Sequence, residues 1–490
     1  MTEAAENKKG TCIFPTARQA KWVLAFLIGY FTFRLVYFAV SIAGYVPPDE
    51  TTHLGLCRIF SGFFLPDDTP QTYDYGLVTH VPWLYYWVMG KLLLLNVFGI
   101  PDLIFLRLAN IPIALAALYY SIRLVRLMTD DRLIHLLLVV VMTNTLMLTF
   151  LSASVSYDNL LILLATMAIY YHFAFYCRRE GVLLGLSWLC QLAGCLTKSA
   201  FLPIPLILNI LLLISEFSRL KIFPRALVDW WRNTGKTGTL LVAAIFFALV
   251  LNLNLYGVNL LTYGKPVPEM MDVLSPDQYM QNRIAARDSI FMGYKEGDIG
   301  YSQAMRMSSL IRHPGDRAGT VYLLRNYREH VESKAELMSP LEYLIPWGNR
   351  VLQTVYGIMG HISMFARPVT LWPISLLFLL AAGGALLRAR SLEKGRLFLQ
   401  LAAVAVGYLA ILIYTFNYQN YYYYSSFDIA LQGRYVFPVI APFYCLFTYF
   451  LLRLFNHPRN RLILATLTAL IFVASDLPFF LYHATRDWFF

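Results

Sequence analysis

Asp49 and Glu50 are adjacent carboxylates that follow a Pro-Pro pair, and His53 comes three residues after Glu50. Residues three apart are neighbours on a helix, so Glu50 and His53 would share a face of a helix beginning at Asp49. A carboxylate placed this way can take the proton of an attacking hydroxyl, and two carboxylates with a histidine can hold a divalent metal. The alternative is structural, because the prolines end the preceding helix and Asp49 can cap the next one.

Three more ionisable residues stand at the ends of apolar runs. His80 precedes Pro82 and an aromatic stretch, where a histidine either lines a site or is structural. Asp158 lies in a very short turn and either caps the following helix or faces the same site as Asp49. Lys198 ends an apolar run, where an ionisable residue is costly and tends to be functional, although snorkelling to the interface is the competing interpretation.

The stretch Gln432-Gly433-Arg434-Tyr435 opens a late apolar run. The planar guanidinium of Arg434 is suited to bind a phosphate through two hydrogen bonds. The tyrosine-rich segment before it, residues 418–424, is typical of the aromatic belt at a membrane interface, and such rings also stack on sugars.

The composition predicts a polytopic membrane protein. Of the 490 residues, 58% are hydrophobic and only 14% are charged, whereas soluble domains carry about a quarter charged residues. The net charge of +11 needs no nucleic acid, because cytoplasmic Lys/Arg loops produce such an excess. The first apolar run, residues 22–45, is too long for a signal peptide and is expected to remain as an anchor. Among the six cysteines only Cys57 falls in an expected external segment, so we expect no disulfide framework.

The basic residues predict the orientation. Lys and Arg residues precede the first apolar run, which places the N-terminus inside, and each later basic cluster should also lie inside. Consecutive clusters must therefore be separated by an even number of crossings. This requirement makes residues 81–99 an interfacial aromatic helix on the outer face rather than a span, and the same holds for residues 351–365.

The predicted fold is an all-α polytopic membrane protein of about eleven transmembrane helices, with the N-terminus inside and the C-terminus outside. The boundaries of the expected spans are accurate to within a few residues. The expected spans are residues 22–45, 103–127, 133–153, 159–177, 182–198, 202–217, 238–256, 370–388, 397–416, 434–454 and 461–483.

Three segments then lie outside, residues 46–102, 257–369 and 417–433. The chain divides into an N-terminal transmembrane module over residues 1–256, which includes the first external loop, a small and mostly helical external subdomain over 257–369, and C-terminal transmembrane helices over 370–490. Most charges of the middle segment, Arg283 among them, are expected to be solvated surface.

The layout resembles the GT-C superfamily of membrane glycosyltransferases. The resemblance rests on the Asp-Glu pair after the first span, a long first external loop, Asp158 in the second external turn and Thr197-Lys198 after the fifth span. Protein O-mannosyltransferases and lipid A aminoarabinose transferases share this layout. The Pro-Pro-Asp-Glu stretch, taken together with Gly433-Arg434-Tyr435, is closer still to an uncharacterised bacterial family of GT-C-like membrane proteins.

This resemblance implies a glycosyltransferase that moves a sugar from a polyprenyl-phosphate donor to a glycan, lipid or protein acceptor at the external face, with inversion. A bacterial inner-membrane location is expected. By carry-over, Asp49 and Glu50 are the catalytic residues. His53, His80, Asp158, Lys198, Arg434 and Tyr435 bind substrate, with Lys198 and Arg434 on the lipid phosphate.

The cofactor question stays open in the sequence, because some GT-C enzymes use a divalent metal, Mg²⁺ or Mn²⁺, and others do not. If one is present, Asp49, Glu50 and His53 would hold it. Two other functions remain as alternatives. A glycan polymerase or ligase would use the same kind of donor, whereas a flippase for a lipid-linked glycan would usually show inverted repeats and broken helices, and the sequence shows neither.

Overall fold

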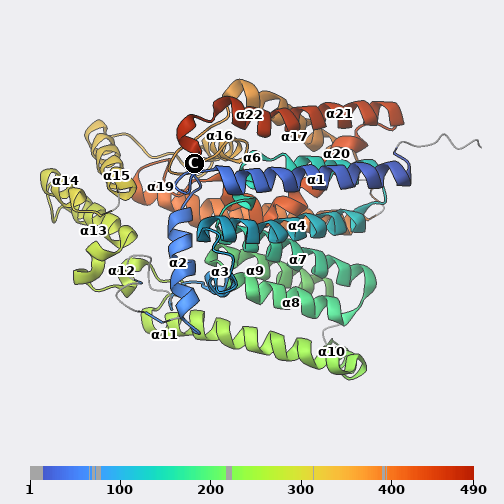
Figure 1. Ribbon diagram of the computed structural model, residues 1–490, viewed down its shortest axis with the longest axis horizontal. Coiled ribbons are helices and arrows are strands. Elements are labelled where there is room, and N and C mark those ends of the chain that lie inside the picture. The colour runs from blue at the N-terminus through green and yellow to red at the C-terminus, as the bar shows by residue number, and fades with distance from the viewer. Residues whose placement is uncertain are drawn as a thin grey trace, which may run out of the picture.

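The computed structural model describes residues 15–65, 67–68, 72, 79–216, 223–312, 314–388, 392 and 394–490. Lys8, Lys9 and Cys12, which precede residue 15, lie outside this part. Long helices run side by side, and shorter helices gather at one end of them (Figure 1). In the described residues the only extended pairings are two isolated bridges, Ile42 with Phe489 and Ile358 with Met364.

Nine helices within the described residues are long and apolar enough to cross a membrane, and each coincides with an expected span. The expected span 182–198 is a shorter apolar helix, α8 (Gly181–Cys195). The chain is therefore an all-α integral membrane protein. The nine helices cover Ala17–Ser41, Asp102–Met128, Tyr157–Arg178, Ser199–Glu216, Gly235–Tyr263, Leu371–Arg388, Gly395–Tyr424, Gly433–Arg453 and Pro458–His483.

Some of these spans are composite. Two contain a π-helical turn, and the last two are joined from shorter helices. A π turn shifts the faces of the two helical halves against each other. The elements that form these spans include α1 (Ala17–Ser41), α4 (Asp102–Met128), α7 (Tyr157–Arg178), α9 (Pro203–Glu216), α10 (Phe223–Asn252), α11 (Val258–Tyr263), α17 (Pro368–Arg388), α18 (Gly395–Ile411), α19 (Tyr418–Tyr424), η8 (Gly433–Val439), α20 (Ile440–Arg453), α21 (Pro458–Ala474) and α22 (Leu477–His483).

The expected span 133–153 is broken into α5 (Arg132–Thr143) and α6 (Leu146–Ser152), which meet at 70°. The expectation that no helix is broken is therefore wrong here. The break is held by Arg34 of α1, which is fully buried, donates to the carbonyl of Thr143 and lies 3.2 Å from Oδ1 of Asn144. Arg34 also pairs with Asp476, between α21 and α22, because a buried charge is tolerated only with a partner.

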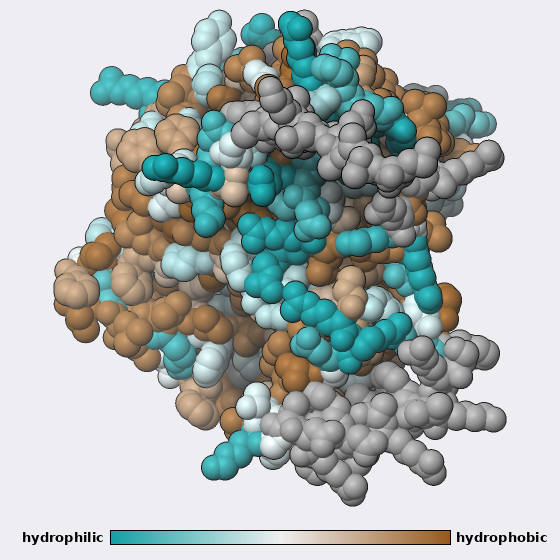
Figure 2. Space-filling model, turned by 90° about the vertical axis from the view of Figure 1, so that its right-hand side faces the viewer, coloured by the Kyte–Doolittle hydropathy of each residue, from teal (hydrophilic) through white to brown (hydrophobic). Residues whose placement is uncertain are grey.

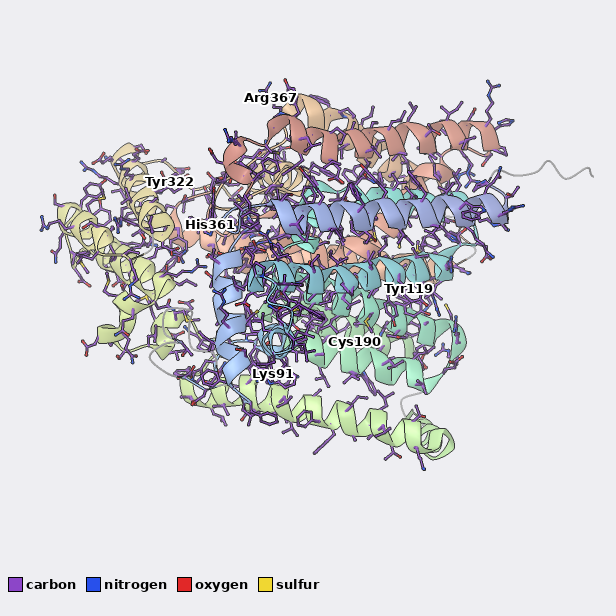
Figure 3. The ribbon with its side chains drawn as sticks, viewed as in Figure 1. Lys91, Tyr119, Cys190, Tyr322, His361 and Arg367 are labelled. Atoms are coloured by element: carbon purple, nitrogen blue, oxygen red, sulfur yellow. The ribbon has the colours of Figure 1, made fainter. Side chains whose placement is uncertain are left out.

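The described residues of the segment 46–102 include two short helices, α2 (Glu50–Gly62) and α3 (Leu84–Leu93). Ten residues of helix reach about 15 Å, half of the hydrocarbon core, so α3 is too short to cross by itself. Its position on the outer face stays a prediction. The two helices lie close, since a Cβ on Gly90 would stand 2.7 Å from the carbonyl oxygen of Cys57. Lys91 of α3 donates to the carbonyls of Ser61 and Phe63 at the end of α2 (Figure 3).

The middle segment is helical, as expected, with α12 (Met270–Val273), α13 (Arg283–Glu296), α14 (Tyr301–Ser309), α15 (Pro314–Ser333) and α16 (Leu344–Val355). The helices α13, α14 and α15 pack around a small core of their own, which Tyr424 of α19 completes. Tyr322 of α15 donates to Asp428 at 3.1 Å, which ties this unit to the segment before η8 (Figure 3). The three-part division of the chain stays a prediction.

The two ends of the bundle differ. The last residues return to the end of α1, where the N–H of Phe490 donates to the carbonyl of Ser41, so α1 begins and the chain finishes at opposite ends. This arrangement fits the odd number of crossings that the sequence predicts. Helices α2 and α13 lie at the end of the bundle that holds the C-terminus (Figure 1). Figure 2 shows the opposite end, where hydrophilic side chains gather. Which end faces the cytoplasm stays a prediction.

The topology can be tested by labelling single cysteines in a cysteine-free background. If α3 stays on the outer face, a cysteine at position 100 reacts with an impermeant external reagent and one at position 130 does not. These positions precede and follow α4, the helix that would be the first crossing after α1. Protection of position 100 together with labelling of position 130 would show that the segment around α3 crosses the membrane.

Candidate active site

Asp49 stands between α1 and α2 with φ 58°, a left-handed conformation that costs energy in a residue other than glycine. It occupies the N-cap position of α2, yet its side chain makes no capping hydrogen bond. Instead, Oδ1 accepts from Nη2 of Arg283 at 3.0 Å, and Oδ2 accepts from Nη2 of Arg434 at 2.7 Å. The Nε of Arg434 donates to Gln432 at 2.6 Å. The carboxylate of Asp49 therefore serves two arginines rather than the helix end.

Arg434 reaches this position because η8 packs closely on α16. A Cβ on Gly433 would stand 2.7 Å from Oγ1 of Thr354, so only glycine fits, and the N–H of Gly433 donates to that oxygen at 2.7 Å. The side chain of Arg434 is only 2% exposed, and its Nη1 lies 3.5 Å from Oδ2 of Asp158. Neither of these two atoms makes a hydrogen bond within the described residues, so both keep unused hydrogen-bonding capacity.

Asp158 and Lys198 form the second ion pair of the site. Ser156 caps α7 through its own side chain, which leaves the carboxylate of Asp158 for Lys198, whose Nζ donates to Oδ1 at 2.8 Å. The ammonium of Lys198 also lies 4.2 Å from the ring centre of Tyr157 and 5.2 Å from that of Tyr435. Lys198 is thus held inside by a carboxylate and two aromatic faces, and it does not snorkel.

The charge balance sets the protonation of Asp49. Burial alone would raise its pKa, but the positive charges of Arg434 and Arg283 outweigh burial and hold the pKa of Asp49 well below its usual range. Asp49 is therefore a carboxylate at any physiological pH. A carboxylate with so low a pKa has little affinity for a proton, and it gains basicity only when one of the guanidinium groups is drawn away.

A cavity of about 350 Å³ opens beside these charges. The side chains of Asp49 and Arg283, which are 26% and 25% exposed, line it together with Lys198, whereas Arg434 and Asp158 lie behind them. Its wall combines α2, α7, the turn after α8 and the segment leading into α13. Among the other lining residues are Thr52, His53, His80, Tyr86, Tyr157, Ser199, Tyr256 and Pro268.

Both histidines singled out in the sequence reach this cavity. His53 is buried, with Nδ1 2.9 Å from the hydroxyl of Tyr86 and with no partner for Nε2 among the described residues. Burial lowers the pKa of His53 to about 3, so its ring is neutral between pH 5 and 8. His80 lies 2.9 Å from Oδ1 of Asn259, which fixes its ring at the cavity wall.

Glu50 makes an ion pair away from the cavity. Its oxygens accept from the guanidinium of Arg107, with Nε at 2.8 Å, and from the N–H of Val155 at 2.7 Å. Arg107 donates further to the carbonyls of Ala39 and Ile42 at 3.1 and 2.6 Å. Both charged groups are fully buried, and Glu50 is absent from the cavity lining. This geometry favours a positioning role for Glu50, and its catalytic assignment stays a prediction.

The ligand set considered for a metal does not fit this geometry. Asp49 is bound to two arginines, Glu50 points to Arg107, and the Nδ1 of His53 is engaged by a tyrosine hydroxyl. In the part of the chain that the structure describes, no group of three or more His, Cys, Asp and Glu side chains is placed to hold a metal ion.

Arg283 is the site residue that sequence reasoning missed. The expectation that the charges of the middle segment are solvated fails for Arg283, which binds Asp49 and also lies 3.8 Å from Oδ1 of Asp316. Asn282 caps α13 through its side chain and so fixes Arg283 at the first position of that helix. No local pattern distinguishes Arg283 from its exposed neighbours, because its partner stands 234 residues away in the sequence.

The comparisons with known proteins give little further guidance. No family model matches the chain, and no curated protein matches it. Among solved structures, ArnT from Cupriavidus metallidurans in the apo state is 12% identical, with a TM-score of 0.37 over 93% of this chain and 78% of that one. The structure of the same protein bound to undecaprenyl phosphate is 15% identical, with a TM-score of 0.36 over the same shares of the two chains. Values this low carry no conclusion about family or function.

The positioning role of Glu50 predicts a stability effect. We expect Glu50→Gln to lower the free energy of unfolding by about 3–5 kcal/mol, because Arg107 is then left buried without its counter-charge. Thermal unfolding of the purified protein measures the loss, with Glu296→Gln on the exposed end of α13 as the control that should change little. An unaltered unfolding temperature with lost activity would instead make Glu50 catalytic.

Proposed function

We propose that this integral membrane protein is a glycosyltransferase that moves a sugar from a polyprenyl-phosphate donor to an acceptor hydroxyl at the external face, with inversion. One observation carries the proposal: the carboxylate of Asp49 is bridged by Arg434 and Arg283 at the edge of a cavity whose wall holds Lys198. A carboxylate next to several cations, at the end of a transmembrane bundle, suits proton removal beside a bound lipid phosphate.

The donor phosphate would be held by the cations of the site. The cations Arg283, Arg434 and Lys198 are all paired with carboxylates, among them Asp316 at 3.8 Å from Arg283. A phosphodiester would therefore compete with these carboxylates for the cations. Nη1 of Arg434 has an unused donor, and the side chain of Lys198 is 13% exposed at the cavity wall. These groups would also stabilise the charge that grows on the phosphate as it leaves.

The same cations couple donor binding to the activation of Asp49. A phosphate that takes hydrogen bonds from Arg283 and Arg434 competes with the carboxylate for them, and the pKa of Asp49 then rises from its depressed value. Asp49 accepts the proton of the acceptor hydroxyl. The hydroxyl oxygen forms the new bond to the anomeric carbon, the bond from that carbon to the phosphate oxygen breaks, and polyprenyl phosphate leaves with the electron pair.

The remaining residues have supporting roles in this proposal. Asp158 holds Lys198 in place, and Tyr435 gives the ammonium an aromatic face. His53 and His80 line the cavity as neutral or fixed rings that contact the sugar or the acceptor. Because the proposed ligand set does not fit a metal, no step is assigned to one.

The function is tested by Asp49→Asn, which keeps the size of the side chain but removes the proton acceptor. We expect a folded, membrane-inserted protein that binds a polyprenyl-phosphate sugar as well as the wild type or better, since a competing carboxylate is gone. Transfer should fall by a factor on the order of 10² or more. Asp277→Asn, on an exposed part of the external subdomain, serves as the matched control and should keep full activity. Near-normal turnover of Asp49→Asn would remove the central group of the proposal.

A second test uses the pH dependence of kcat/KM, which reports the pKa of the free enzyme. The guanidinium of Arg283 stabilises the charged form of Asp49, so Arg283→Gln should raise the pKa of Asp49. The carboxylate is then protonated at a higher pH, and the acid limb of the profile should move to higher pH. Arg325→Gln, on α15 and outside the cavity lining, is the control. An acid limb at the same pH in both variants would contradict the assignment of Asp49 as the base.

A further inference from the structure

A larger cavity, of about 570 Å³, lies at the opposite end of the bundle from the candidate active site. Its walls come from the turn between α4 and α5 and from the neighbouring ends of α18, α20 and α21. Helix α4 connects the two sites, since Arg107 near its start binds Glu50 and Met128 at its end lines this cavity. The 21 residues between them span about 30 Å of helix. Figure 2 views the molecule from this end.

Positive charge predominates in the lining. Asp130 and Asp131 are the acidic members, and the basic members come from four different helices or turns. Cations at this end are expected from the positive-inside rule alone, but that rule does not predict that they converge on one hollow. The basic side chains of the lining are Arg132, Lys394, Arg453 and Arg461.

Several of these cations keep unused donors. Asp131 pairs with Arg461 and accepts a hydrogen bond from the N–H of Leu133, so the carboxylate of Asp131 already has partners within the protein. Even so, Nε of Arg461 has no partner within the described residues. The ammonium of Lys394 donates to the carbonyl of Leu127 at 2.8 Å, which uses one of its three hydrogens.

Two aromatic rings share the lining with the cations. The rings of Phe398 and Tyr449, both in the lining, have centroids 4.4 Å apart. The guanidinium of Arg453 lies 5.5 Å from the centre of the Tyr449 ring. A hollow lined by several cations and by aromatic rings, at the end of transmembrane helices, matches the chemistry of an anionic headgroup attached to a lipid.

We propose that this cavity binds a phosphate-bearing ligand, with the headgroup of an anionic phospholipid of the adjoining leaflet as its source. The phosphate lies between Lys394, Arg453 and Arg461, and the glycerol portion rests on Phe398 and Tyr449. A soluble phosphate ester has the same recognition chemistry and is the other source that the experiment distinguishes. This site is independent of the proposed transferase reaction.

The experiment compares two double variants that remove the same charge. Lys394→Gln with Arg453→Gln removes two cations of the lining. Arg396→Gln with Arg459→Gln removes two exposed cations at the same end, on α18 and α21, that are not in the lining. The full chain in detergent is titrated with phosphatidylglycerol, with phosphatidylcholine and with glycerol 3-phosphate, and bound ligand is counted by native mass spectrometry. Unfolding temperatures verify that both variants are folded.

We expect the wild type and the exposed-cation variant to prefer phosphatidylglycerol over phosphatidylcholine, and the lining variant to bind it on the order of tenfold more weakly. If glycerol 3-phosphate binds instead, and only the lining variant loses it, the site is confirmed with a soluble ligand as its source. Equal losses in both variants, or no preference for any phosphate monoester or anionic lipid in the wild type, would overturn the proposal and leave these cations a role in orientation alone.

Discussion

The ion pairs of Asp49 join the first, middle and last parts of the chain at one carboxylate. Arg283 and Arg434 stand 234 and 385 residues further along, at the start of α13 and in η8. The guanidinium of Arg434 is almost fully buried, and a buried charge is tolerated only when it is paired, so its contact with Asp49 ties the last part of the chain to the first. Asp49 keeps its left-handed backbone while its carboxylate contacts both guanidinium groups, which is the kind of place where backbone strain persists.

This arrangement gives Asp49 two opposed properties. The two arginines keep it charged and oriented, and in doing so they lower its affinity for a proton. A general base needs the reverse, a pKa nearer the working pH. The conflict disappears if an anionic substrate takes over the arginines, because the substrate then supplies the negative charge that they require. Such an exchange would keep Asp49 inactive until the donor is bound, and it would link specificity for phosphate to the timing of proton removal.

The sequence predicts the parts of this structure that depend on local signals. Apolar runs of membrane length mark the spans, and Asp158, Lys198 and Arg434 stand at their ends. Arg434 pairs with Asp49, and Asp158 pairs with both Arg434 and Lys198. The break between α5 and α6 is not visible in the sequence, because its cause is a distant arginine on α1. Arg283 escapes notice for the same reason. A pairing between residues hundreds of positions apart produces no periodic pattern in the sequence. The sequence therefore does not distinguish Arg283, which reaches the cavity, from the other charged residues of the middle segment.

The neighbouring residue, Glu50, explains how the site keeps its geometry although Asp49 itself lies on an irregular turn. One oxygen of Glu50 accepts from both Arg107 and the N–H of Val155, which fixes the start of α2 against α4 and against the turn that carries Asp158. Arg107 in turn holds the last carbonyls of α1. The backbone on both sides of Asp49 is therefore anchored by one buried pair. The two adjacent carboxylates therefore have different roles: Glu50 is withdrawn from the cavity and fixes the backbone, whereas Asp49 lines the cavity and binds two arginines.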